Sequence, residues 1–140
     1  MRYVTLGRTG LAVSEFGFGC IPIIRLSKDD AVNLLRHAFE RGITLFDTAN
    51  AYRDSEEKIG IAFAGMREKI VLASKTLKRG AEDVTAHLEN SLRMLKTDYL
   101  DLYQLHQIAQ EKEWEEVTVC QVVCQSTMAC SRCGAIRRCF

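Results

Sequence analysis

Four short apolar runs recur at near-equal spacing along the first 106 residues, and this spacing limits the possible folds more than any other feature. The runs are residues 16–20, 43–47, 70–75 and 99–106. Their last residues are separated by 27, 28 and 31 positions, which is the length of a strand followed by a crossover helix. The spacing therefore predicts an α/β fold with a parallel sheet.

Helix signals fill the first and third intervals between these runs. Ser27 with Asp30 three residues later predicts a capped helix start, and Gly42 marks where that helix should end. Another helix is expected between Gly80 and the turn at residues 97–98. The apolar positions at helical spacing are Ala31, Leu34, Leu35, Ala38 and Phe39 in the first, and Val84, Leu88, Leu92 and Leu95 in the last.

The second interval also reads as a helix. Ser55 is its predicted cap, and Glu56 and Glu57 would lie at the positive end of the helix dipole. Its apolar positions are Ile59, Ala62, Phe63 and Met66. Across the chain, the aromatic residues expected in the core are Phe16, Phe18, Phe39, Phe46, Phe63 and Tyr103.

A β-hairpin is predicted before the first strand–helix unit. Residues 3–6 and 11–14 flank the turn sequence Gly7-Arg8-Thr9-Gly10, and the hairpin would cap one end of the sheet. No Pro- or Ser-rich linker interrupts the pattern that follows. We therefore expect one domain up to about residue 117.

The overall charge and composition exclude several function classes. Nineteen Lys and Arg against eighteen Asp and Glu leave no basic field for a nucleic acid, and no stretch is apolar enough to span a membrane. Residues 1–7 lack the apolar core of a signal peptide, so a cytoplasmic location is expected.

The composition changes abruptly near residue 117. Residues 118–140 contain no Asp, Glu, Leu or Lys and hold five of the six cysteines. Cys130 and Cys133 have zinc-ribbon spacing, but only five residues separate Cys124 from Cys130, so no metal site is predicted. The change favours a shifted reading frame after about Val117, and this cysteine-rich segment receives no structural assignment.

Residues with complementary chemistry stand at or just after three of the predicted strand ends. They are Asp47, Tyr52, Lys75 and His106. The carboxyl ends of parallel strands meet on one rim, so these side chains are expected to converge there. An ammonium beside a phenol stabilises the phenolate, a carboxylate compensates the buried ammonium, and a neutral imidazole can orient a carbonyl. The set is suited to proton donation to a carbonyl oxygen.

These residues also carry a family resemblance. The segments in question are Gly7-Arg8-Thr9-Gly10-Leu11, Gly17-Phe18-Gly19, residues 42–49, Tyr52, Glu56, Gly60, residues 73–76 and residues 98–106. In order and approximate spacing they resemble the aldo-keto reductase superfamily over roughly residues 2–117.

The resemblance implies a (β/α)8 barrel of the TIM type and a nicotinamide cofactor, NADPH with NADH as the other possibility. It implies that Asp47, Tyr52, Lys75 and His106 form the catalytic tetrad, with Tyr52 donating the proton while hydride reduces an aldehyde or ketone to an alcohol. Gly19, Cys20 and Asp47 would contact the nicotinamide end of the cofactor.

The length of the chain adds a further expectation. A (β/α)8 barrel takes ~250 residues, whereas only four strand–helix units are recognised here. We expect a truncated chain that is weakly active or inactive alone, and that self-associates through the exposed edges of its sheet.

Two alternatives stay open at this point. Residues 17–22 nearly match a dinucleotide-binding fingerprint with Asp47 as the ribose acid, but Pro22 replaces the third glycine. Alternatively, the chain is a non-catalytic auxiliary or binding subunit, a role that aldo-keto reductase folds also serve in potassium channels. Cofactor-dependent turnover of an aldehyde would distinguish an enzyme from such a subunit.

Overall fold

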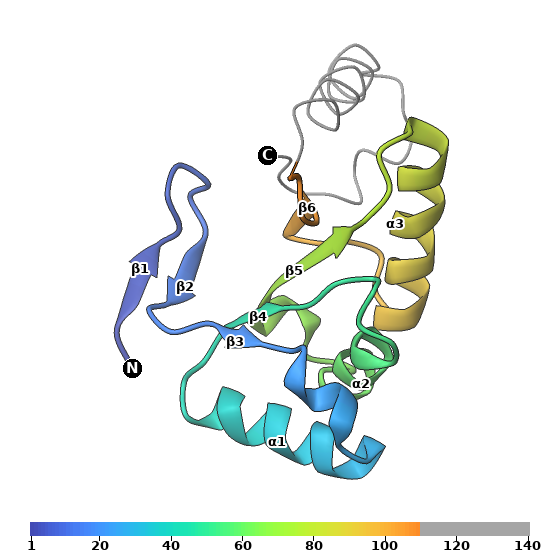
Figure 1. Ribbon diagram of the computed structural model, residues 1–140. Coiled ribbons are helices and arrows are strands. Elements are labelled where there is room, and N and C mark those ends of the chain that lie inside the picture. The colour runs from blue at the N-terminus through green and yellow to red at the C-terminus, as the bar shows by residue number, and fades with distance from the viewer. Residues whose placement is uncertain (110–140) are drawn as a thin grey trace.

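The computed structural model describes residues 1–109 and contains the predicted parallel sheet (Figure 1). Its strands are β3 (Phe18–Gly19), β4 (Leu45–Asp47), β5 (Val71–Thr76) and β6 (Leu102–Leu105). They pair in parallel in the order β3-β4-β5-β6, so each strand lies beside its neighbours in the chain. The predicted α/β class is confirmed. The predicted boundary near residue 117 and the segment 118–140 lie outside the described residues.

Three helices supply the crossovers between these strands. They are α1 (Lys28–Glu40), α2 (Ser55–Ala62) and α3 (Ala81–Leu95), with shorter 3-10 turns at η1 (Pro22–Arg25) and η2 (Arg67–Lys69). Helix α2 packs against both α1 and α3, and the three lie on the same side of the sheet (Figure 1). Within residues 1–109, no helix is both long and apolar enough to cross a bilayer.

Helix α1 begins and ends as the sequence predicts. The Ser27 hydroxyl accepts a hydrogen bond from the Asp30 backbone N–H at 3.1 Å, which satisfies one of the free amides of the first turn. Gly42 follows the helix with a φ of +92°, and a Cβ there would lie 2.8 Å from the Met1 Cβ. Both the left-handed backbone and the close contact require glycine at this position.

The predicted start of helix α2 is wrong by one residue. Asp54 occupies the N-cap position without a side-chain cap, and Ser55 is the first helical residue. The Ser55 hydroxyl is buried, where it donates to the Cys20 carbonyl oxygen at 3.1 Å and bonds the Thr48 hydroxyl at 2.9 Å. The Ser55 hydroxyl is therefore bonded to Cys20 and Thr48 in the loops after β3 and β4, and it does not cap the helix backbone.

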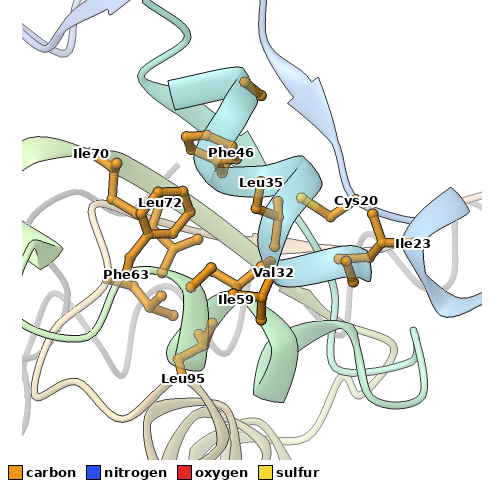
Figure 2. Close-up of a cluster of buried hydrophobic side chains, with 14 of the residues drawn as sticks. Cys20, Ile23, Val32, Leu35, Phe46, Ile59, Phe63, Ile70, Leu72 and Leu95 are labelled. Atoms are coloured by element: carbon orange, nitrogen blue, oxygen red, sulfur yellow. The ribbon is translucent and has the colours of Figure 1, made fainter. Parts of the chain in front are cut away.

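The hydrophobic core lies between the sheet and the helices. Figure 2 shows part of this cluster, which includes Cys20, Ile23, Val32, Leu35, Phe46, Ile59, Phe63, Ile70, Leu72 and Leu95. Phe46 of β4 is fully buried, and its ring centroid lies 4.7 Å from that of Phe63. Each such side chain stabilises the fold by about 1.5–3 kcal/mol through burial alone.

Two predicted core residues lie on the surface. Phe16, in the bend before β3, is 67% exposed, and Leu34 of α1 is 40% exposed. The buried arc of α1 is centred on Leu35 and extends toward Val32, so Leu34 falls on the solvent side of the helix. Phe16 precedes the strand and therefore has no helix opposite it.

The N-terminal hairpin is confirmed as β1 (Tyr3–Thr5) and β2 (Ala12–Ser14), which pair antiparallel. Ser14 and Thr44 attach it to the sheet: each backbone N–H donates to the other residue's hydroxyl at 2.9 Å. Thr44 immediately precedes β4, so the hairpin lies at the amino ends of the parallel strands. The carboxyl ends, where the predicted site residues lie, remain clear of it.

Candidate functional site

The rim formed by the strand ends brings together the residues that the sequence singled out. Gly19 pairs in register with Asp47, and Lys75 with Gln104. Just beyond the strands, the Cys20 N–H donates to the Asp47 carbonyl oxygen at 2.8 Å. On the far side, the His106 N–H donates to the Thr76 carbonyl oxygen at the same distance. The parallel ladder thus continues one residue past β3 and β6.

Lys75 and Asp47 form the first pair on this rim. The Lys75 ammonium donates to Asp47 Oδ1 and to the Thr48 carbonyl oxygen, the latter at 2.8 Å. Only 17% of the Lys75 side chain is exposed, against 40% for Asp47. The largely buried ammonium is thus paired and hydrogen-bonded, while the carboxylate keeps contact with solvent.

Tyr52 and His106 form the second pair. The Tyr52 hydroxyl lies 3.0 Å from His106 Nε2, and the two rings meet edge to face at 87°. The turn at residues 49–55 holds Tyr52 in place, because its N–H donates to the Ala49 carbonyl oxygen and its own carbonyl oxygen accepts from the Ser55 N–H. Both backbone polar groups of Tyr52 are therefore hydrogen-bonded, although the residue lies in a loop.

The two pairs are adjacent. Lys75 Nζ lies 5.6 Å from the centroid of the Tyr52 ring, within the range of a cation–π contact. The structure therefore gathers a carboxylate, an ammonium, a phenol and an imidazole around one position. A positive charge at this place would stabilise negative charge that develops on a neighbouring oxygen during a reaction.

Gly19 and Cys20, the other predicted site residues, are placed differently from each other. Gly19 is exposed, and a Cβ built on it would meet nothing within 4 Å. The Cys20 thiol is buried in the apolar core, and burial raises its pKa to about 12, with the nearby Asp47 charge adding to the rise. Cys20 as a whole is fully buried, and its N–H and carbonyl oxygen already bond to the Asp47 carbonyl oxygen and the Ser55 hydroxyl, so it fixes the backbone beside the rim rather than facing a ligand.

Buried polar residues behind the rim were missed by sequence reasoning. Glu56 is 3% exposed and accepts a hydrogen bond from the Ser74 hydroxyl at 2.6 Å. In the sequence, Glu56 is expected at the helix dipole and is one of the residues that carry the family resemblance, but neither observation predicts its burial or a role in the site. Helical position alone does not distinguish it from the neighbouring Glu57, which pairs with Lys28 at the surface.

Lys58 was also missed. It is 1% exposed, and its ammonium donates to the carbonyl oxygens of Ile23 and Leu26 at 3.0 and 2.9 Å and pairs with Asp54 at 2.9 Å. These contacts tie α2 to the loop that follows β3. Lys58 fixes the shape of the rim next to Gly19 without reaching it.

Other parts of the described chain offer no competing site of similar chemistry. Within residues 1–109, no three His, Cys, Asp or Glu side chains are grouped so that they could hold a metal ion. A recess of about 550 Å³ is lined by Arg67, Arg93, Lys96 and Tyr99 among others. These residues lie near the amino ends of β5 and β6, at the opposite end of the sheet from the rim.

Comparison with known proteins identifies the family. The model of the Aldo/keto reductase family matches residues 16–130. The uncharacterized oxidoreductase YrpG of Bacillus subtilis is 36% identical over 84% of this chain and 43% of its own length. The aldo-keto reductase YhdN of the same organism is 37% identical over 76% of this chain and 38% of its own. The chain thus spans about two fifths of the length of these relatives.

Solved structures agree with the sequence relatives. A putative aldo-keto reductase from Pseudomonas aeruginosa superimposes with a TM-score of 0.83 at 32% identity, covering 98% of this chain and 57% of that one. An aldo-keto reductase from Klebsiella pneumoniae in complex with NADPH gives 0.78 at 32%, covering 99% and 48%. The four parallel strands and three helices correspond to part of a (β/α)8 barrel. The chain belongs to the aldo/keto reductase family, whose members are generally oxidoreductases.

Proposed function

We propose that this chain carries the proton-donating site of an NAD(P)H-dependent reductase that converts aldehydes or ketones to alcohols. One observation carries the proposal. The Tyr52 hydroxyl lies 3.0 Å from His106 Nε2, while its ring lies 5.6 Å from the Lys75 ammonium that Asp47 neutralises. Family membership supports the reaction class.

Each of the four side chains has a role in this reaction. Tyr52 donates its hydroxyl proton to the substrate's carbonyl oxygen as hydride adds to the carbonyl carbon. The Lys75 ammonium stabilises the phenolate left on Tyr52, and the Asp47 carboxylate holds Lys75 in position through their ion pair. The His106 imidazole orients the same oxygen. Tyr52 is only partly buried, so its phenolate oxygen then recovers a proton from solvent.

The residues around the strand ends fit the nicotinamide end of a cofactor. Gly19 leaves open space beside Asp47, so that a flat ring can approach the backbone closely. We propose that Gly19 and Asp47 hold this group, while the buried Cys20 fixes the backbone beside them. When bound, the reduced nicotinamide supplies the hydride. NADPH is the proposed cofactor, with NADH as the other possibility, since two similar structures contain NADPH or NADP.

We further propose that these 140 residues turn over only weakly by themselves and form oligomers. The matched relatives are more than twice as long, and rim loops supply much of the binding energy in this architecture. Among residues 1–109, β3 and β6 form the two edges of the sheet. Open edges favour pairing with another copy. Sedimentation of the purified chain should show a dimer or larger species, and a monomer at all concentrations would contradict this.

The test of function is turnover by the purified full chain. We expect slow, aldehyde-dependent oxidation of NADPH, which is measured as the loss of reduced-nicotinamide absorbance. Tyr52→Phe removes the proton donor and keeps the ring, so it should lower the rate by about 10²–10⁴-fold. Binding of NADPH without any turnover above the Tyr52→Phe background would favour a binding subunit instead.

A further inference from the structure

A buried carboxylate lies directly behind the strand that carries Lys75. Glu56 of α2 accepts the hydroxyl hydrogen bond of Ser74 at 2.6 Å, and both residues are almost completely buried. Successive side chains of a strand point to opposite faces, so Ser74 points toward the helices while Lys75 points to the rim. Glu56 therefore holds β5 from the back at the position next to Lys75.

The same carboxylate also reaches the loop that carries Tyr52. The Asn50 side-chain amide donates to the Ser91 hydroxyl of α3 at 3.4 Å, and both side chains favour the charged form of Glu56 and so lower its pKa. The Asn50 backbone N–H donates to the Lys75 carbonyl oxygen at 2.9 Å, and Asn50 stands two residues before Tyr52. Glu56 thus bonds directly to the strand that carries Lys75 and interacts electrostatically with Asn50 in the loop that carries Tyr52.

Burial at this place is energetically unfavourable for a charge. It raises the pKa of Glu56, and the side chains of Ser74, Ser91 and Asn50 offset part of that rise. The other titratable groups that face it are His87 of α3 and Tyr103 of β6, and burial raises the pKa of Tyr103 to about 12. An apolar residue would pack here at lower cost, so the carboxylate has a role beyond filling space.

We infer that Glu56 is a positioning residue, whose buried carboxylate sets the placement of Tyr52 relative to Lys75. The inference rests on the proposed function for its catalytic meaning, because it concerns the same proton-donating site. The expected effect of Glu56 on the structure can be tested whether or not the chain turns over a substrate. Removing the carboxylate should loosen the contact between Asn50 and Lys75 while leaving the far end of β5 in place.

The primary test is amide hydrogen exchange in the full chain, measured by NMR without cofactor or substrate. Glu56→Gln keeps the size of the side chain but removes its charge and replaces one acceptor oxygen with an N–H donor group. We expect exchange of the Asn50 N–H to rise about tenfold. The Val71 N–H, which bonds the Thr44 carbonyl oxygen at the other end of β5, should exchange at its original rate.

Two further variants make the test specific. Glu57→Gln removes the same charge from the same helical turn at a partly exposed position and should leave the Asn50 rate unchanged. Ser74→Ala removes the strand-side partner and should reproduce the Glu56→Gln effect in a chain that still folds. Equal increases at Asn50 and Val71, or no increase at Asn50 in either variant, would overturn the inference.

Turnover provides the second readout. Misplaced reacting groups slow the chemical step, so Glu56→Gln should lower kcat by about tenfold with KM unchanged, and Glu57→Gln should alter neither. An active wild type whose kcat is insensitive to Glu56→Gln would refute a positioning role. A wild type without turnover would instead count against the proposed function, and the exchange measurement would still decide the structural claim.

Discussion

The two faces of strand β5 show two uses of polar side chains. Lys75 points to the rim, where its partner Asp47 stays 40% exposed. Ser74 and Thr76, its immediate neighbours, are fully buried and bond to Glu56 and His87 behind the sheet. Charged groups on the rim remain accessible to a ligand, whereas those behind it can only fix the geometry. We therefore expect substitutions on the rim face to change mainly turnover, and substitutions on the buried face to change mainly the free energy of unfolding.

Lys75→Met should produce the largest effect on the rim face. The variant keeps a long side chain but removes the charge next to Tyr52, so turnover should fall by about 10²–10⁴-fold. The free energy of unfolding should change by no more than about 1 kcal/mol, since Asp47 can be solvated. Rate assays with denaturant titrations check both values. A large loss in the free energy of unfolding would show that Lys75 also holds the fold together, and would contradict the expected difference between the two faces.

Phe46→Ala should do the reverse on the buried face. Phe46 lies one residue before Asp47 but points into the core, so its truncation should cost about 3–5 kcal/mol. Phe16→Ala is the matched reference because Phe16 is 67% exposed, and it should change stability by less than about 0.5 kcal/mol. Urea unfolding of the two variants should differ accordingly, and equal losses would contradict the assignment of the core.

Two glycines extend the comparison. A Cβ on Gly60 of α2 would lie 2.7 Å from the backbone of Leu95, so Gly60→Ala should cost about 1–3 kcal/mol despite alanine's better helix propensity. A Cβ on Gly19 would meet nothing within 4 Å, so Gly19→Ala should leave unfolding unchanged. It should instead weaken NADPH binding, which fluorescence quenching of the chain measures. Unaltered binding would remove Gly19 from the proposed cofactor site.

The smallest effect concerns pH. Burial raises the pKa of Glu56 in the folded chain above its ordinary value of 4.5, so the folded state holds this proton more tightly than the unfolded state. Its contribution to stability is therefore complete below pH 4.5 and is lost as pH rises through the raised value. The stability of the wild type relative to Glu56→Gln should fall over that range in urea titrations. A difference that grows with pH would contradict the assigned shift.

Much of the fold follows from spacing, which is why it could be predicted. Apolar runs about 28 residues apart leave room for one crossover helix, and parallel strands then bring their carboxyl ends to one rim. The proximity of Asp47, Tyr52, Lys75 and His106 follows from that topology. Their separations and orientations depend on the loop at residues 49–55, whose geometry no periodic pattern encodes.

The residues that sequence reasoning misplaced are those whose burial depends on tertiary contacts. Ser55, Glu56 and Lys58 are polar residues in the first turn of a helix, where caps and dipole partners are expected. Here that turn packs beneath the loops after β3 and β4, so their polar groups bond inward. Helical periodicity alone gives no means of separating such residues from solvent-facing ones.

The strand order β3-β4-β5-β6 matches the order of synthesis. Each strand and its helix can dock on a template already present, without waiting for a segment made later. Assembly on the ribosome can thus proceed from the N-terminus by successive addition, with one growing edge exposed at each stage.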